Sequence, residues 1–263
     1  MPIRARHLAA AALALTASAA RAELVTRTVE YRQGDTVLEG YLAYDSAGPA
    51  KKPGVLVFHQ WKGLTAYEKK RAEQLAALGY VAFAADIYGK GVRPADPKAA
   101  GAEAGKYRGN RPLLRARTQA ALAALRQQPN VEGEKIAAIG YCFGGGAALE
   151  LARSGADVLG VVSFHGSLTT PTPQDAKNIR GKVLVLHGAD DPAAPRADVL
   201  ALQDELTAGG VDWQVVLYSG VVHSFTQPEA GNDRSKGNAY DARADRRSWD
   251  AMKGFFAELF AGP

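Results

Sequence analysis

The stretch AAIGYCFGGGAAL, residues 137–149, decides the fold and contains the only cysteine of the chain. An apolar run with the composition of a buried strand ends at Cys142, and a glycine-rich helical segment follows it directly. Gly140 and Gly144 flank the cysteine in a GxCxG pattern. Such glycines let a strand and a helix approach closely across a sharp turn. The pattern predicts a nucleophile elbow that raises the thiol above the sheet at a helix N-terminus, where the helix dipole favours thiolate.

The rest of the chain alternates between strand-like and helix-like runs. Six runs carry continuous apolar residues, which is typical of strands buried on both faces of a parallel sheet. They are residues 53–59, 80–88, 135–141, 158–166, 182–188 and 213–218. Apolar residues at helical spacing lie between them, and two earlier runs around Gly34 and Asp35 predict an antiparallel hairpin at a sheet edge. We therefore predict an α/β fold, with a mostly parallel sheet flanked by helices on both faces.

Three long stretches show no clear periodicity and are predicted to be loops at strand ends. They are residues 89–112, 167–181 and 226–238. In open α/β sheets, ligands bind beyond the carboxyl ends of the strands. We therefore expect at least one of these stretches to roof a pocket.

The first 22 residues have the pattern of a secretory signal peptide. A basic start, MPIRARH, is followed by an uncharged apolar run and by small residues around Ala22. We expect cleavage near Ala22, a secreted and periplasmic protein, and a single domain over residues 23–263. Cleavage would remove three arginines and no acid, which lowers the formal net charge from +5 to +2. That balance does not favour a nucleic-acid partner, and the later sequence has no run of about 20 apolar residues that would span a membrane.

A thiol nucleophile needs a base, and the base needs an orienting acid, in the chain order nucleophile, acid, histidine. His223 follows a predicted strand and is the only histidine after the candidate acids Asp190 and Asp191, between which the pattern itself does not choose. The other histidines of the expected domain end apolar strands, where a packed imidazole is the simpler interpretation. They are His59, His165 and His187. No metal-ligand spacing or nucleotide-binding glycine motif is present, so we predict no metal and no cofactor.

Several motifs resemble the dienelactone hydrolase family of α/β-hydrolases. GYCFGG is similar to the family's cysteine elbow, GADDPAAP to its acid loop, HSF to its histidine loop and LGYVAFAADIYGKG to a segment ending its fourth strand. The resemblance covers residues 26–260. It implies a sheet of eight strands and a triad of Cys142, Asp191 and His223.

The resemblance and the elbow also imply an oxyanion hole. The elbow offers the backbone N–H of Phe143, and the resemblance adds that of Trp61. The candidates for an apolar pocket wall are Trp61, Tyr88, Phe225 and Tyr141, although each is also a plausible core residue.

Three polar positions depart from the family pattern. Gln60 stands where family members commonly carry a glutamate that interacts with the cysteine. Lys90 and Gln227 stand where the founding enzymes bind the substrate carboxylate with arginines. Lysine keeps a charge without the bidentate geometry, and glutamine has no charge. All three are predicted to contact substrate, and the departures make dienelactone itself a doubtful substrate.

The sequence thus predicts a hydrolase of a carboxylic ester or lactone that acts through an acyl-thioester intermediate. Its partner would be a small-molecule ester or lactone, and the protein would be a monomer or weak dimer. Two alternatives remain at this point. One is a catalytically silent binding protein on the same fold, and the other is an acyltransferase.

Overall fold

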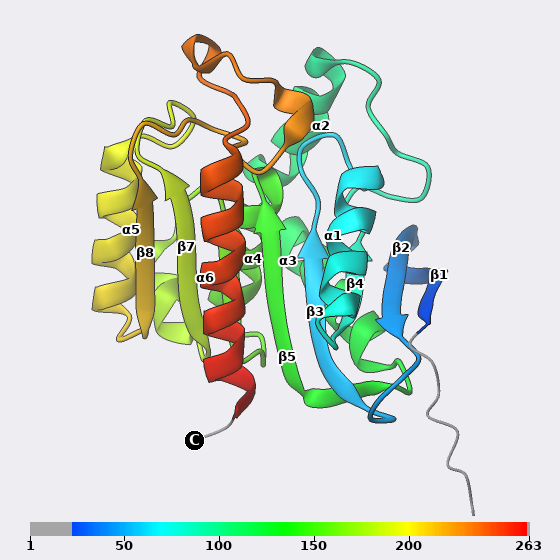
Figure 1. Cartoon of the computed structure of the whole chain (residues 1–263). Helices are drawn as coiled ribbons and strands as arrows, with labels where there is room; N and C mark the ends of the chain where they lie inside the picture. The colour runs from blue at the N-terminus through cyan, green and yellow to red at the C-terminus, as the bar shows by residue number, and fades with distance from the viewer. Residues whose placement is uncertain (1–22, 262–263) are drawn as a thin grey trace, which may run out of the picture.

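The computed structural model describes residues 23–261, and its central element is a sheet of eight strands (Figure 1). The predicted signal peptide, residues 1–22, lies outside the described residues. The strands are β1 (Leu24–Gln33), β2 (Thr36–Asp45), β3 (Lys52–Phe58), β4 (Val81–Ala85), β5 (Val131–Tyr141), β6 (Gly160–Phe164), β7 (Lys182–Gly188) and β8 (Trp213–Tyr218). Their order is β1-β2-β4-β3-β5-β6-β7-β8. β1 pairs with β2 and β2 with β4 in the antiparallel sense, whereas the remaining pairs are parallel. The predicted α/β fold with a mostly parallel sheet and an edge hairpin is confirmed.

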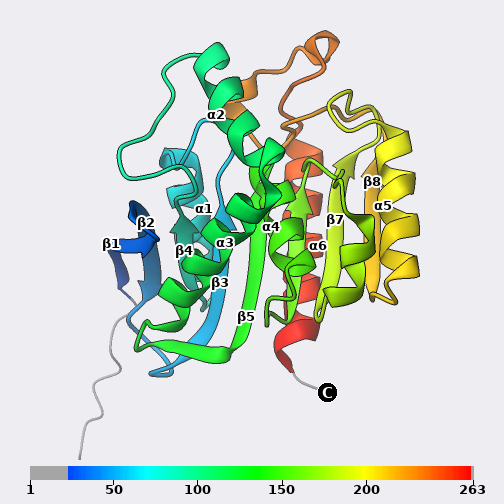
Figure 2. The ribbon, with the colours of Figure 1, turned by 180° about the vertical axis from the view of Figure 1, so that it is seen from behind.

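Helices cover both faces of the sheet. They are α1 (Ala66–Ala77), α2 (Pro97–Gly109), α3 (Arg111–Arg126), α4 (Phe143–Arg153), α5 (Arg196–Ala208) and α6 (Ala242–Ala261), with short 3₁₀ turns η1 (Pro173–Asn178), η2 (Pro228–Ala230) and η3 (Arg234–Lys236). α1 and α6 lie on the face seen in Figure 1, and α3, α4 and α5 lie on the face seen in Figure 2. Within the described residues, no helix has the length and apolar character to cross a membrane.

The alternation of side chains along each strand produces a core on each side of the sheet. On β3, Leu56 and Phe58 pack under α3 and α4, whereas Val55 and Val57 pack under α1. All four side chains are buried. A strand buried on both faces must be apolar at every position, which explains the continuous apolar runs of the sequence.

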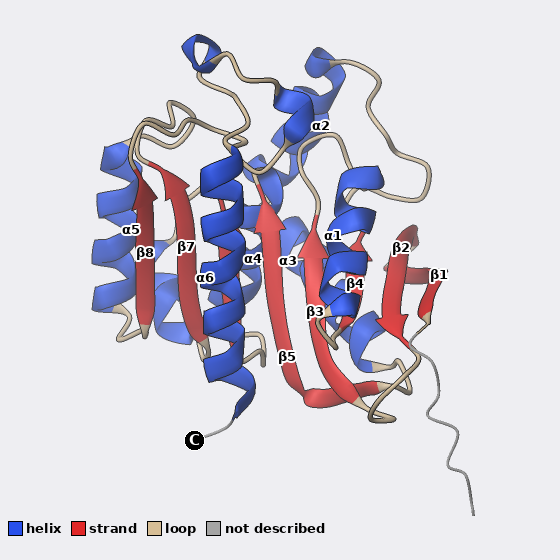
Figure 3. Ribbon diagram, viewed as in Figure 1, coloured by secondary structure: helices blue, strands red, loops and turns tan. Residues whose placement is uncertain are grey.

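The loops at the carboxyl ends of the parallel strands gather above one edge of the sheet, where Figure 3 shows them in tan. The prediction that residues 89–112 form only a loop is wrong, because α2 begins at Pro97. Asp96 caps this helix by accepting the Ala99 N–H at 2.8 Å, and proline occupies the first turn. The helix has no strong apolar stripe because glycines and small alanines fill it, so its periodicity is weak.

Candidate active site

Cys142 occupies the turn between β5 and α4. Its backbone has φ 54° and ψ −116°, a conformation that non-glycine residues adopt only when the surroundings enforce it. A Cβ on Gly140 would lie 1.9 Å from the carbonyl oxygen of Gly144, and a Cβ on Gly144 would lie 2.2 Å from that of Phe58. Glycine is therefore required at both positions. The strained turn places the sulfur at the N-terminus of α4.

Two loops bring an imidazole and a carboxylate to this thiol. His223 follows β8, and its Nε2 lies 3.1 Å from the Sγ of Cys142. Asp191 follows β7, and its Oδ2 lies 2.7 Å from the Nδ1 of His223. The other carboxylate oxygen of Asp191 accepts the Ala193 N–H at 2.8 Å. The carboxylate thus orients the imidazole from one side while the thiol meets the opposite nitrogen.

The structure distinguishes the two neighbouring aspartates that the sequence pattern alone left open. Asp191 is 3% exposed and faces His223, whereas Asp190 is exposed and its backbone N–H donates to the Val221 carbonyl at 3.0 Å. Of the other histidines, His59 and His187 are buried and bonded to backbone carbonyls. They serve packing, as the simpler interpretation of the sequence has it.

The thiol and the imidazole shift each other's ionisation. Burial of the Cys142 thiol opposes its ionisation, but the charge and hydrogen bond of His223 and the charge of Arg108 together lower the pKa of Cys142 below its usual value. Burial likewise opposes the imidazolium. The charge of the Cys142 thiolate and the hydrogen bond that His223 donates to Asp191 nevertheless raise the pKa of His223 to about 10. Each group therefore stabilises the charged form of the other.

A cavity of about 400 Å³ opens onto the cysteine. The residues that line it are Gln60, Trp61, Lys62, Gly63, Thr65, Glu68, Arg108, Cys142, His223, Ser224, Gln227, Glu229, Ala230 and Asn238. They come from the loop after β3, from the first turn of α1, from α2, from the elbow and from the histidine loop. The expectation that one of the long stretches would roof a pocket is met twice, because both α2 and residues 226–238 contribute.

The loop after β3 carries Trp61, and two buried side chains hold it. The carboxylate of Glu68 accepts the N–H of Gln60 at 3.2 Å and the N–H of Thr65 at 2.8 Å, so it ties the two ends of the loop together. The hydroxyl of Tyr88 donates to the Trp61 carbonyl at 2.9 Å. These bonds fix the backbone on which the Trp61 N–H lies.

Three of the predicted substrate contacts, Gln60, Trp61 and Gln227, line the cavity, but Tyr88 and Phe225 do not. Tyr88 packs edge-on against His59, with ring centroids 4.6 Å apart, and acts on the site through its bond to Trp61. Phe225 belongs to the histidine loop and is fully buried. Both are core residues because their aromatic area is more stable inside the protein than at the cavity wall.

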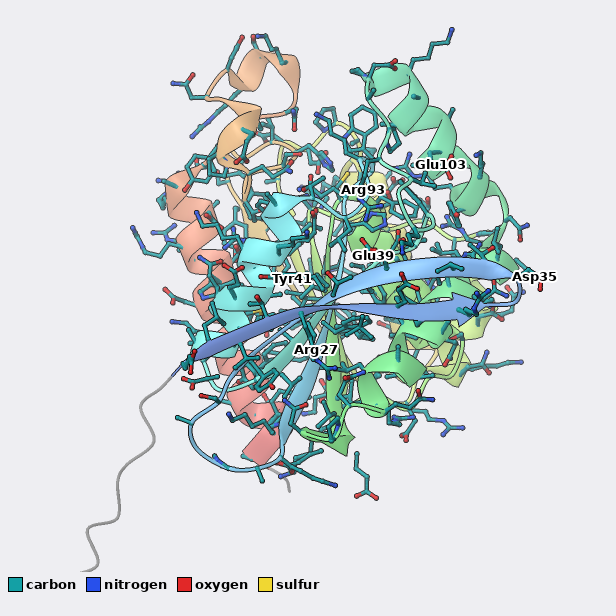
Figure 4. All side chains as sticks on the ribbon, turned by 90° about the vertical axis from the view of Figure 1, so that its right-hand side faces the viewer. Arg27, Asp35, Glu39, Tyr41, Arg93 and Glu103 are labelled. Atoms are coloured by element: carbon teal, nitrogen blue, oxygen red, sulfur yellow. The ribbon has the colours of Figure 1, made fainter. Side chains whose placement is uncertain are left out.

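Lys90 also lies outside the cavity, contrary to the prediction that it contacts substrate. Its ammonium pairs with Glu30 and lies 3.7 Å from Glu39, and both acids belong to the β1–β2 hairpin. Figure 4 shows this hairpin from the side, with Glu39 labelled and Asp35 at the turn. These two acids are distant from Lys90 in the sequence, and they pair with the lysine outside the cavity.

Sequence reasoning missed Arg108, which lines the cavity from the last turn of α2. Its guanidinium lies over the Phe143 ring, 5.9 Å from the centroid, and forms no ion pair with any described residue. Two positions earlier on the helix, Lys106 is paired with Glu103. The signal that could have revealed Arg108 was the Asp96-Pro97 helix start, which places a helix above the sheet.

The cavity offers charged and hydrogen-bonding groups rather than a metal site. Across residues 23–261, no three or more His, Cys, Asp and Glu side chains are arranged so that they could hold a metal ion. The buried acid Glu68 already accepts from two backbone N–H groups and from the Thr65 hydroxyl.

Comparisons with known proteins agree with this architecture. The sequence model of the dienelactone hydrolase family matches residues 38–260. A solved protein named m3DLH is 42% identical, with a TM-score of 0.87 over 90% of this chain and 99% of that one. A dienelactone hydrolase-like promiscuous phosphotriesterase from metagenomic libraries is 44% identical, with a TM-score of 0.86 over 90% of this chain and 98% of that one. A protein of Aquifex aeolicus (strain VF5) named "Putative carboxymethylenebutenolidase" is 29% identical over 234 residues, 87% of this chain and 96% of the relative.

The family match covers most of the chain, and the fold and the strand-to-helix turn at Cys142 are consistent with it. The predicted family resemblance is confirmed. The chain belongs to the dienelactone hydrolase family and is a hydrolase of carboxylic esters or lactones.

Proposed function

We propose that the protein hydrolyses its ester or lactone through a covalent acyl-thioester on Cys142. The observation that carries this proposal is that the two ring nitrogens of His223 contact Sγ of Cys142 and the carboxylate of Asp191, at 3.1 Å and 2.7 Å. In this account Cys142 is the nucleophile, His223 moves the proton and Asp191 holds the imidazole in the required tautomer.

In the first step the thiolate attacks the carbonyl carbon and forms a tetrahedral intermediate. Its oxyanion would accept hydrogen bonds from the backbone N–H groups of Phe143 and Trp61. As the carbon–oxygen ester bond breaks, the imidazolium of His223 gives its proton to the leaving alkoxide. Neutral His223 then takes a proton from water, which attacks the thioester. Collapse breaks the carbon–sulfur bond, releases the acid and expels the Cys142 thiolate, while His223 keeps the proton that it took from water, so the ion pair is restored.

Because Gln60 is neutral, His223 must be the group that activates the thiol of Cys142 in this chain. A neutral amide cannot accept a proton from the thiol, so the role of a carboxylate at this position is absent. The charge of His223 lowers the pKa of Cys142 and so favours the thiolate without a carboxylate at position 60. The protein would then be active before substrate arrives.

Two cations, Lys62 and Arg108, and two acids, Glu68 and Glu229, line the cavity, so a preference for an anionic group rests on Arg108. Arg108 and Lys62 both line the cavity, and the guanidinium of Arg108 is free to form a bidentate pair with a carboxylate. Glu229 lies on the histidine-loop side of the cavity lining. We therefore propose an ester or lactone that carries a carboxylate on the side of α2.

Initial rates with a chromogenic short-chain ester test the proposed nucleophile. Cys142→Ala should reduce turnover to the background rate, and Cys142→Ser should leave at most a weak enzyme, because the serine hydroxyl is not ionised near neutral pH. Full activity of either variant would contradict thiolate chemistry. No turnover of any ester by the wild-type protein would favour the silent binding protein, and growth of the product chain would favour acyl transfer.

A second candidate activity is phosphotriester hydrolysis. The observation that favours it is the 44% identity to a protein named as a promiscuous phosphotriesterase. The same thiolate and the same two N–H donors could serve a phosphoryl centre. An aryl phosphotriester offered to the wild-type protein and to Cys142→Ala tests it. Release of the aryl alcohol by the wild-type protein alone would support this activity, and equal rates would exclude it.

A further inference from the structure

Behind the imidazole of His223 lies a second imidazole, that of His165. This residue follows β6, is 0% exposed and has φ 38°, a conformation that costs energy outside glycine. The centroid of its ring lies 5.2 Å from that of His223, with the planes at 72°. Burial, and then the neighbouring charge of His223, hold the pKa of His165 well below its usual value, so the ring is neutral. The other charged or titratable groups that act on it are His187 and Arg71.

Thr226 links this neutral ring to the histidine loop. It lies three residues after His223 and is 0% exposed. Its Oγ1 lies 2.8 Å from the Nε2 of His165 and 2.6 Å from the hydroxyl oxygen of Tyr67 on α1. A single hydroxyl therefore ties the loop both to the end of β6 and to α1.

Arg71 holds the other side of this arrangement. Its Nε donates to the Tyr67 hydroxyl at 3.2 Å, and its Nη2 donates to the Thr226 carbonyl at 3.1 Å and to Asp245 on α6 at 2.6 Å. The guanidinium also lies over three aromatic rings, those of Tyr67, Tyr141 and Trp249. A long side chain held by so many partners has little freedom, so it is a rigid support for the loop.

The histidine loop needs such a support. Ser224, the residue after His223, has φ 56°, and a strained conformation of this kind persists only where the surrounding structure enforces it. The bonds to Asp191 and Cys142 fix the two ring nitrogens of His223, but they leave the ring free to pivot about the axis that joins those nitrogens. The ring of His165 packs against that pivoting ring, and Thr226 anchors the chain two residues beyond the strained position.

We propose that Thr226 and His165 are positioning residues for His223. The Thr226 hydroxyl fixes the neutral His165 ring and the histidine loop together, and this pair holds the His223 imidazole in line between Asp191 and Cys142. His165 adds no second positive charge beside the imidazolium, because it is buried and neutral. The inference rests on the proposed role of His223 as the proton carrier.

The first test compares Thr226→Val with Thr226→Ser on an ester substrate. Valine keeps the shape and removes the hydroxyl, so kcat should fall about tenfold with little change in KM, since proton transfer depends on alignment. The rate of Cys142 alkylation by iodoacetamide should fall with it. Serine restores the hydroxyl and should recover most of both rates. Thr118→Val is the matched control, because Thr118 is equally buried and its hydroxyl donates within α3, to the Arg115 carbonyl at 2.9 Å.

Wild-type kcat in Thr226→Val, or an equal loss in Thr226→Ser and Thr226→Val, would overturn the proposal. A second measurement covers the case in which the valine variant does not fold. Nitrogen-15 NMR of the imidazole rings of the wild-type protein should show His165 neutral and in one tautomer from about pH 5 to 9. Titration of His165 in that range, or exchange between its tautomers, would overturn the proposal. This spectrum is informative even if Cys142 is never acylated, so it separates failure of the positioning role from failure of the proposed mechanism.

Discussion

The buried carboxylate of Glu68 accepts the backbone N–H of Gln60 at 3.2 Å, one residue before the proposed oxyanion donor. The same carboxylate completes the capping box of α1 with Thr65. One acid thus stabilises the start of a helix and the loop that faces the cysteine. Loss of this carboxylate should therefore affect both the stability of the fold and the proposed catalysis.

We predict that Glu68→Ala lowers kcat by about tenfold or more, because the Trp61 N–H loses its fixed direction toward the oxyanion. The free energy of unfolding should fall by about 1 kcal/mol or more through loss of the cap. Ester kinetics and urea denaturation measure the two effects. Lys70→Ala, an exposed change on the same helix, should leave both near wild type. Unchanged kcat in Glu68→Ala would show that the loop does not depend on this carboxylate.

The ion pair predicts a specific pH dependence. The thiolate form of Cys142 should persist below pH 8.5, the ordinary pKa of a thiol, and it should be lost as the pH falls through the lowered pKa of Cys142. On the alkaline side, kcat/KM should fall as His223 deprotonates near its pKa of about 10. Thiolate absorbance and alkylation rate against pH measure the first limb.

Replacement of the His223 imidazole should raise the pKa of Cys142 instead of lowering it. In His223→Ala the burial of Cys142 remains, but the main charge that lowers its pKa is gone. The thiolate should therefore form only at a pH above the ordinary pKa of a thiol. An unchanged thiolate titration in His223→Ala would contradict the ion pair.

Arg108 is predicted to set the preference for anionic substrates. Arg108→Ala should raise KM for a carboxylate-bearing ester about tenfold and change KM for a neutral ester little, since a lost charged hydrogen bond costs about 1.5 kcal/mol or more. Lys106→Ala, on the same helix and paired with Glu103, is the control. Equal effects of Arg108→Ala on both esters would contradict the assignment.

Gly144→Ala is predicted to be severely destabilising. The added Cβ would meet the Phe58 carbonyl oxygen at 2.2 Å, and neither backbone can retreat without separating β3 from α4. We expect the free energy of unfolding, measured by thermal or urea denaturation, to fall by about 3 kcal/mol or more, or the variant to fail to fold. Gly105→Ala on α2 is the matched control, because its Cβ would meet nothing within 4 Å. That variant should be as stable as wild type or up to about 1 kcal/mol more stable. A stable Gly144→Ala would refute this explanation of the elbow glycine.

The sequence was informative where one local pattern determines the structure. The glycines around Cys142 predict the turn, because a Cβ at either position would clash with backbone atoms. The continuous apolar runs predict buried parallel strands. Asp190 and Asp191 could not be separated by local pattern, since their exposure depends on how the loop after β7 folds. The spacing of the acid-loop motif, which only the family resemblance supplies, pointed to Asp191.

The errors arose where distant contacts decide the outcome. Lys90 follows a strand end as a substrate contact should, but acids on the β1–β2 hairpin hold it elsewhere. Arg108 was missed because α2 is rich in glycine and alanine and lacks an apolar stripe, so only its Asp96-Pro97 start signals a helix. The contact of His165 with Thr226 joins residues 61 positions apart, which no periodicity reveals.

Intact-protein mass spectrometry after a brief exposure to an activated ester tests the central proposal most directly. The account predicts a mass increase equal to the acyl group, located on Cys142, formed within one turnover and lost again as product appears. The same exposure of Cys142→Ala should give no adduct and no turnover. An adduct on another residue, or wild-type turnover in Cys142→Ala, would contradict the account.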